Sequence, residues 1–182
     1  SLRDAGVGWT APQALSAALP EAARYDLAVG STGLASVVWE RRTGSTWRIE
    51  ESHLSGGLWS ATQRVATGRD PHVVVDASGV ATVAWSNRGL RVARRSAGGS
   101  WSAARRIGDR TPWLVDLASN TQGDVAVAWS DRSHSVKAAV RPVGRKEFRR
   151  TQTLGKGPSV TSLRPAVDRR GRAVALWSVT GI

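Results

Sequence analysis

Four segments of the chain repeat one pattern, a Gly followed six residues later by a Trp, and this repeat constrains the fold more strongly than any other feature. Three residues before each Gly stands another small or turn-forming residue, Gly, Asp, Asn or Asp in the four copies. The Trp residues recur at intervals of 46, 44 and 48 residues, so the chain is an internal repeat. The four pairs are Gly33–Trp39, Gly79–Trp85, Gly123–Trp129 and Gly171–Trp177.

Each copy of the pattern predicts a β-hairpin. The alternating apolar residues on both sides of the Gly, such as Val73–Val75 and Val80–Trp85, fit the two-residue period of a strand. The Asp or Asn that precedes the Gly, as at Asp76, Asn120 and Asp168, accepts hydrogen bonds from backbone N–H groups two residues on. Because Gly readily takes a positive φ, this sequence favours a tight turn between two strands.

Two further strands are predicted after each hairpin, which gives four short antiparallel strands per unit. This number of strands at a period of about 45 residues is typical of a β-propeller blade. We therefore predict an all-β fold, a four-bladed β-propeller of four-stranded antiparallel blades. The third strands are expected at residues 47–50, 90–93 and 136–140. The fourth strands are expected to carry Trp59, Trp101 or Phe148 and to end near Val65, Ile107 or Leu154.

The last unit is split between the two ends of the chain. The chain stops five residues after Trp177, whereas the first residues, SLRDAGVGWTAPQALS, align through Trp9 with the last two strands of a unit. We therefore predict that the N- and C-terminal strands share one blade and close the ring. The result is one domain, residues 1–182, with blades at about 24–66, 70–108, 111–155 and 160–182 plus 1–19. A monomer and a homodimer that completes the ring both remain open.

Units of the form A-V-D-x-x-G-x-A-x-V-x-W-S, followed by G-G-x-W-S, resemble the repeats of bacterial sialidase-like Asp-box β-propellers. The Asp-box itself is degenerate here, because Ser96 and Arg42 stand where the family has Asp, and only Asp4–Gly6 keeps the Asp and Gly. The resemblance implies the propeller scaffold. Sialidases also carry a Tyr nucleophile with a Glu partner, an Asp acid/base and three Arg residues. The single tyrosine, Tyr25, lies in no matching motif, so the resemblance does not bring the activity with it.

The net charge of +12 is concentrated in the second half of the chain. Residues 1–86 hold 7 Arg and 8 acidic residues, whereas residues 87–182 hold 16 Arg and 3 Lys against 6 acidic residues. Such an asymmetry indicates an acidic partner. No nucleic-acid-binding motif accompanies the basic residues, so sequence-specific nucleic-acid recognition is not expected.

Two groups of side chains are candidates for ligand binding. The repeat pattern does not require Trp47 or Trp113, and aromatic residues outside a scaffold pattern are better candidates for recognition than those inside it. The repeat Trp residues themselves are expected to pack between neighbouring blades, and stacking on sugars is the alternative. The second group lies just after the repeat Trp residues, where a ring of guanidinium groups at one end of the blades would suit carboxylate, sulfate or phosphate. Its members are Arg41, Arg42, Arg88, Asp131 and Arg132.

The sequence predicts no catalytic residues, no metal site and no cofactor. The chain has no Cys, and the three histidines, His53, His72 and His134, show no metal-ligand spacing. No nucleophile-elbow, phosphate-loop or dinucleotide-binding pattern stands in a fitting context. No apolar stretch approaches the roughly 18 residues that a membrane span requires.

These observations predict a non-catalytic binding module for a carbohydrate or an anionic polymer, with ligand sites between blades or on the axis. A structural or protein-interaction platform, within a longer repeat protein, is the alternative, and a sialidase-like glycoside hydrolase is the third. The expected partner is a glycan or an acidic polymer, or else another protein. The expected location is outside a bacterial cell.

Overall fold

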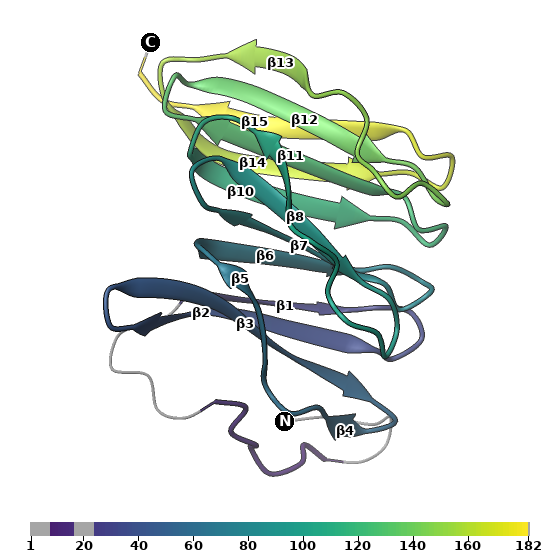
Figure 1. Ribbon diagram of the computed structural model, residues 1–182. Helices are drawn as coiled ribbons and strands as arrows, with labels where there is room; N and C mark the ends of the chain where they lie inside the picture. Colours follow the sequence, from purple (N-terminus) through teal and green to yellow (C-terminus); the bar gives the residue numbers. More distant parts are fainter. Residues whose placement is uncertain (1–7, 17–23, 182) are drawn as a thin grey trace.

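The repeat units fold into four separate antiparallel β-sheets in the computed structural model, which describes residues 8–16 and 24–181 (Figure 1). No residue in these ranges belongs to a helix, so none could form a helical membrane span. The prediction of an all-β fold is confirmed.

The bounds of the strands follow the repeat. The first sheet holds β1 (Tyr25–Val29), β2 (Ala35–Thr43), β3 (Thr46–Ser55), β4 (Leu58–Trp59) and β5 (Gln63–Thr67). The second holds β6 (Arg69–Val75), β7 (Ala81–Ser86), β8 (Leu90–Arg95) and β9 (Arg105–Gly108). The third holds β10 (Pro112–Ser119), β11 (Val125–Asp131), β12 (Ser135–Arg141) and β13 (Gln152–Lys156). The fourth holds β14 (Val160–Val167) and β15 (Ala173–Val179).

The turn that opens each unit forms by the chemistry expected from its sequence. In the second unit, Asp76 Oδ1 accepts the N–H groups of Ser78 and Val80 at 3.0 Å, and Gly79 takes a φ of 76°. Asn120 and Asp168 accept equivalent backbone N–H groups in the third and fourth units. A short polar side chain therefore fixes the same hairpin in three of the four units.

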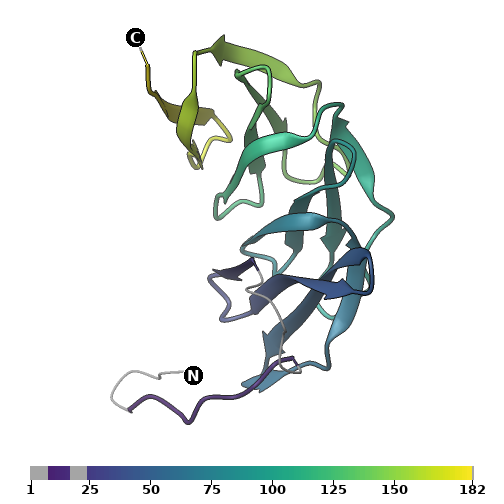
Figure 2. The ribbon, with the colours of Figure 1, turned by 90° about the vertical axis from the view of Figure 1, so that its left-hand side faces the viewer.

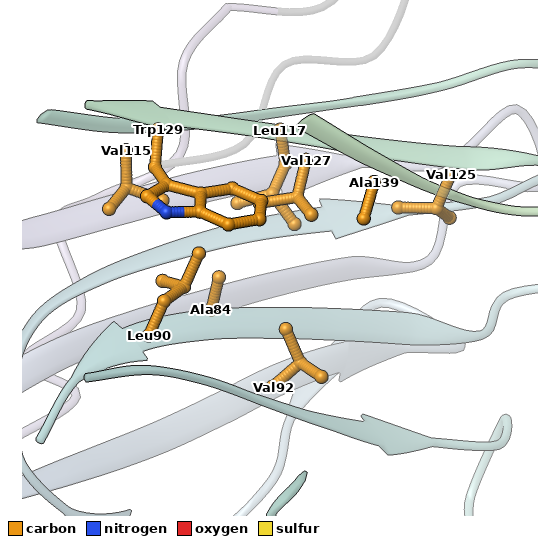
Figure 3. Packing of buried hydrophobic residues seen from close by; sticks show 9 residues of the cluster. All are labelled: Ala84, Leu90, Val92, Val115, Leu117, Val125, Val127, Trp129 and Ala139. Atoms are coloured by element: carbon orange, nitrogen blue, oxygen red, sulfur yellow. The ribbon is translucent and has the colours of Figure 1, made fainter. Parts of the chain in front are cut away.

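Apolar residues fill the spaces between consecutive sheets, which stack face to face in chain order (Figure 1). Figure 3 shows the cluster between the second and third sheets. There, Trp129 lies against Leu90 and Ala84 of the preceding sheet, and 1 % of its surface is exposed. Trp85 packs in the equivalent cluster between the first and second sheets. The expectation that repeat Trp residues pack between blades is thus met at both positions.

A glycine at the end of the preceding sheet makes room for three of the repeat Trp rings. A Cβ atom added to Gly68 would lie 2.2 Å from Trp85 Cδ1. At Gly108 it would lie 3.1 Å from Trp129 Nε1, and at Gly155 2.9 Å from Trp177 Cζ2. Each ring therefore sits directly on the backbone of its neighbour, which explains a second glycine in each unit.

Buried ion pairs join the sheets as well. Arg95, at the end of β8, donates from Nη2 to Glu51 Oε1 of the first sheet at 3.0 Å, and both side chains are buried. Arg141 holds the equivalent place on β12, where its Nη2 donates to the Gly123 carbonyl at 3.1 Å and lies 3.8 Å from Asp76 Oδ2. Burial lowers the pKa of the Arg141 guanidinium, and the neighbouring Arg94 lowers it further.

The outer strands differ from the prediction. The sequence placed each fourth strand around Trp59, Trp101 or Phe148, but the outermost paired strands β5, β9 and β13 begin later. Trp59 lies in the two-residue β4, Trp101 forms an isolated bridge with Arg95, and Phe148 lies outside the strands. Trp101 and Phe148 pack against the apolar clusters between the sheets, and the regular pairing is interrupted there.

The four sheets form an open arc (Figure 2). The fourth sheet has only the two strands β14 and β15 among the described residues, and residues 8–16 contain no strand. The Leu15 carbonyl instead accepts the Thr62 hydroxyl of the first unit at 2.7 Å, at the opposite end of the stack. Closure of the ring by a blade shared between the termini is therefore not seen. Residues 1–7, 17–19 and 182 of that predicted blade lie outside the described residues.

Candidate functional site

A β-bulge sets Trp113 apart from the other tryptophans. In the β10–β11 ladder Pro112 pairs with Asp131 and Leu114 pairs with Ser130, so Trp113 is the extra residue. A bulged residue is left unpaired, and such bulges commonly re-aim a side chain beside a functional site. Trp113 is 62 % exposed, whereas the repeat residue Trp129 of the same sheet is buried.

Trp113 lies at a hollow of about 340 Å³ between the third and fourth sheets. This volume falls within the range of about 300–1,000 Å³ that is usual for small-ligand sites. We call this hollow the Trp113 pocket. Its lining residues are Trp113, Ser130, Asp131, Arg132, His134, Ser159 and Val160.

The turn between β11 and β12 holds the polar side of the pocket in place. Asp131 Oδ1 accepts the Ser133 N–H at 2.9 Å and also the Ser133 hydroxyl, while Oδ2 accepts Lys137 Nζ at 2.9 Å. Burial alone would raise the pKa of Asp131, but the hydrogen bonds from Ser133 and Lys137 outweigh it and lower the pKa to about 2. Asp131 is therefore ionised at neutral pH, and Lys137 balances its charge.

Two groups of the Trp113 pocket have no partner in the described part of the chain. Arg132 is exposed and forms no ion pair with any described residue. The hydroxyl oxygen of Ser130 is buried and makes no hydrogen bond there, although a buried hydroxyl normally has a partner. Because Asp131 and Lys137 cancel, Arg132 gives the pocket a positive charge. The pocket thus offers an aromatic face, a cation and an unsatisfied hydroxyl.

The other predicted tryptophan, Trp47, is in a different environment. It lies on β3 directly opposite Arg42 of β2, and the Arg69 guanidinium covers its ring at 4.3 Å from the centroid. Arg41 of the same hairpin lies 3.7 Å from Glu50. Arg69 therefore already covers one face of the Trp47 ring.

The predicted guanidinium ring is only partly assembled. Arg42, Arg88 and Arg132 lie at or beside equivalent turns, between the second and third strands of their sheets. Arg132 lines the Trp113 pocket together with Trp113 and Asp131. Of the seven residues predicted from sequence, the structure brings together Trp113, Asp131 and Arg132 at the Trp113 pocket, and Arg41, Arg42 and Trp47 on the β2–β3 hairpin.

Sequence analysis missed four members of the Trp113 pocket, Ser130, His134, Ser159 and Val160. Ser130 and Ser159 belong to strand ends whose composition carries no signal of function. His134 was noted only as one of three scattered histidines. Its φ of 60° marks a turn position that non-glycine residues adopt uncommonly. No local pattern could have shown that β14 supplies the opposite wall.

A larger hollow of about 740 Å³ separates the outer part of the third sheet from β15. Its walls include Ala138, Leu154, Ala175 and Trp177, and Arg149, Arg150 and Arg170 stand at its rim. In the second and third sheets, the equivalent space is filled by the two outer strands, β8 and β9 in the second sheet and β12 and β13 in the third. We call this hollow the outer cleft.

Nothing among the described residues points to a metal site or to sialidase chemistry. No group of three or more His, Asp or Glu side chains in that part of the chain could hold a metal ion. Tyr25 lies on β1 and is 77 % exposed on the open face of the first sheet. The Trp113 pocket contains one carboxylate, that of Asp131.

Among the comparisons with known proteins, only the comparison of structures found proteins similar to this chain. No protein-family model matches the chain, and no curated protein matches its sequence. The resemblance to sialidase-like Asp-box propellers is therefore not supported by these sequence comparisons.

Two solved structures illustrate the similarity. The α-L-arabinofuranosidase PaAbf62A from Podospora anserina, in complex with cellotriose, superposes with a TM-score of 0.46 and 10 % identity over 84 % of this chain and 62 % of its own. The polysaccharide lyase Uly1 superposes with a TM-score of 0.46 and 10 % identity over 86 % of this chain and 47 % of its own. The chain thus spans less than two thirds of either protein.

Proposed function

We propose that this protein is a carbohydrate-binding module that recognises an acidic sugar residue in the Trp113 pocket. The observation that carries this proposal is the juxtaposition of Trp113, exposed on a bulge, with Arg132, which has no ion-pair partner among the described residues. The apolar face of a sugar ring would stack on the indole, and a carboxylate would accept hydrogen bonds from the guanidinium.

The charges of the Trp113 pocket favour an acidic sugar over a neutral one. Lys137 neutralises Asp131, so the carboxylate of Asp131 does not compete with a bound anion for Arg132. Binding without catalysis fits these residues, because a glycoside hydrolase ordinarily uses a pair of carboxyl groups. We place this function outside the bacterial cell.

The test compares a galacturonic-acid oligosaccharide with its methyl ester, which has the same ring but no charge. Isothermal titration should give tighter binding of the acid by about tenfold or more, as a charge-assisted hydrogen bond contributes about 1.5–3 kcal/mol. Arg132→Gln should abolish this preference. Trp113→Ala should weaken binding of both ligands by about tenfold.

The chain supplies matched controls for both variants. Arg88→Gln removes the same charge at the equivalent turn of the second sheet, and Trp47→Ala removes an indole that Arg69 already covers. Neither should alter the affinity. Equal losses in Trp47→Ala and Trp113→Ala, or the absence of binding to any uronate-containing glycan, would overturn the proposal.

A further inference from the structure

The two ends of the stack expose apolar sheet faces that are covered everywhere else in the molecule. Tyr25, Leu27 and Val29 on β1 are 77 %, 56 % and 64 % exposed. At the other end, Val174 and Leu176 on β15 are 68 % and 75 % exposed. We call these the β1 face and the β15 face. Clusters of apolar residues on a monomer surface commonly mark an interaction site.

The repeat shows what the β1 face is built to contact. Tyr25 pairs directly with Trp39, so the two side chains share one face of the first sheet. Trp39 is the counterpart of Trp85 and Trp129, whose rings pack on the sheet that precedes their own. Trp39 itself is only 5 % exposed, so the open part of this face is its β1 edge, and by analogy with the other units this edge is the surface that receives a preceding sheet.

The β15 face is the counterpart of the surface that, in the other units, contacts the sheet that follows. Leu176 is the counterpart of Ala84 and Ala128, the residues immediately before the repeat Trp. Ala84 packs against the third sheet and Ala128 packs against the fourth. The β15 face is therefore the surface that contacts a following sheet. A sheet of this same repeat fits each end.

We propose that two copies of this chain associate through these faces, with the β15 face of each copy packed on the β1 face of the other. The arc in Figure 2 curves so that both ends turn toward the same side. A second arc that faces the first could therefore meet both ends at once. The two contacts are reciprocal and related by a two-fold axis, so association closes after two copies rather than continuing into a filament.

The segment around Trp9 gives independent support for this arrangement. Residues 3–11 match residues 95–103 of the second unit at five positions, Arg, Ala, Gly, Trp and Ala. In the second unit Trp101 packs against the core between the sheets, whereas Trp9 is 70 % exposed. Residues 8–16 accompany the first sheet through the Leu15–Thr62 hydrogen bond. In the paired arrangement they approach the partner's outer cleft, where Trp9 takes the place that Trp101 holds in the second unit.

The test is the mass of the whole chain in solution. Sedimentation over about a hundredfold range of concentration should show a mass that rises from 19.4 kDa to twice that value and no further. Leu27→Arg on the β1 face and Leu176→Asp on the β15 face should each abolish association. Both side chains are exposed in the single chain, so neither variant should prevent folding.

Mixing the two variants makes the test specific. A pair of unlike variants has one unaltered contact and one contact that joins the new Arg to the new Asp, so the mixture should regain the doubled mass. Val143→Asp, at another exposed apolar residue, is the matched control and should associate normally. A single-chain mass at every concentration, open-ended polymers, association of either single variant, or no rescue on mixing would overturn the proposal. None of these outcomes depends on sugar binding.

Discussion

The interface between the second and third sheets is complete, whereas the one between the third and fourth sheets is open on its outer side. At the complete interface, Trp129 is buried beneath Leu90 and Val92, and Ile107 and Phe148 of the outer segments pack around the cluster. At the open interface, the equivalent Trp177 is only half-buried and lines the outer cleft.

This difference indicates that the two inner strands and the outer part of a unit contribute separately to the packing between sheets. The inner strands alone are enough to dock a sheet, because β14 and β15 still bury Val160 and Leu163 against the third sheet. The outer part excludes water from the Trp ring. Where that part is missing among the described residues, the chain leaves a cleft and an apolar face.

The largest effect is expected from replacing the repeat Trp at each of the two interfaces, Trp129 at the complete one and Trp177 at the open one. Trp129→Ala should lower the free energy of unfolding by about 3–5 kcal/mol, because it leaves a cavity in a closed core. Trp177→Ala should cost about half as much, since part of its ring already contacts solvent. Urea unfolding of dilute protein measures both. Equal losses would show that the open interface is as well packed as the closed one.

The buried ion pair between Glu51 and Arg95 gives a second test of the difference between the two interfaces. Glu51 accepts hydrogen bonds from Ser36 at 2.9 Å, Gln63 at 2.7 Å and Arg95 at 3.0 Å within the first interface. Glu51→Gln leaves the buried Arg95 without a counter-charge and should cost about 3 kcal/mol.

The matched control for Glu51 is Asp116 at the open interface. Its partner Arg164 lies at 3.1 Å, but the Arg164 side chain is 81 % exposed. Asp116→Asn should therefore cost less than about 1 kcal/mol. A small effect of Glu51→Gln would mean that Arg95 finds water or another acceptor in its place.

The hairpins and the order of the strands could be predicted from the sequence because the information is local. Asp76 and Gly79 specify their turn without help from the rest of the chain. The predicted ends of the outer strands, near Val65, Ile107 and Leu154, agree with β5, β9 and β13, but where these strands begin could not be predicted, because the packing of Trp101 and Phe148 depends on the neighbouring sheet. The bulge at Trp113 and the wall from Ser159 depend on pairing and stacking between distant segments. Trp113 was nevertheless identifiable because it departs from the repeat, and Asp131 and Arg132 were identifiable because they lie just after a repeat Trp, where Arg recurs from unit to unit.

A third test concerns the turn at the open interface, which should depend on charge rather than on packing. The pKa of Asp131 is lowered to about 2 in the folded protein, below its ordinary value of 3.8. Its ionised form therefore stabilises the fold above about pH 4, and this stabilisation is lost as the pH falls toward 2. Asp131→Asn should cost about 2 kcal/mol at pH 7 and almost nothing at pH 2. A pH-independent difference in urea unfolding would assign the loss to the changed hydrogen bonds instead.

The smallest expected effect comes from Leu176, the bulky counterpart of the fully buried Ala84 and Ala128. In dilute protein Leu176→Ala should change the free energy of unfolding by less than about 0.5 kcal/mol, because an exposed side chain has little contact to lose. At concentrations where two copies associate, the same variant should unfold at a lower urea concentration than the unaltered chain, since the partner no longer buries the leucine. A large loss in dilute protein would show that the β15 face is already covered within one chain. The concentration dependence of one substitution thus separates an open end of the stack from a closed one.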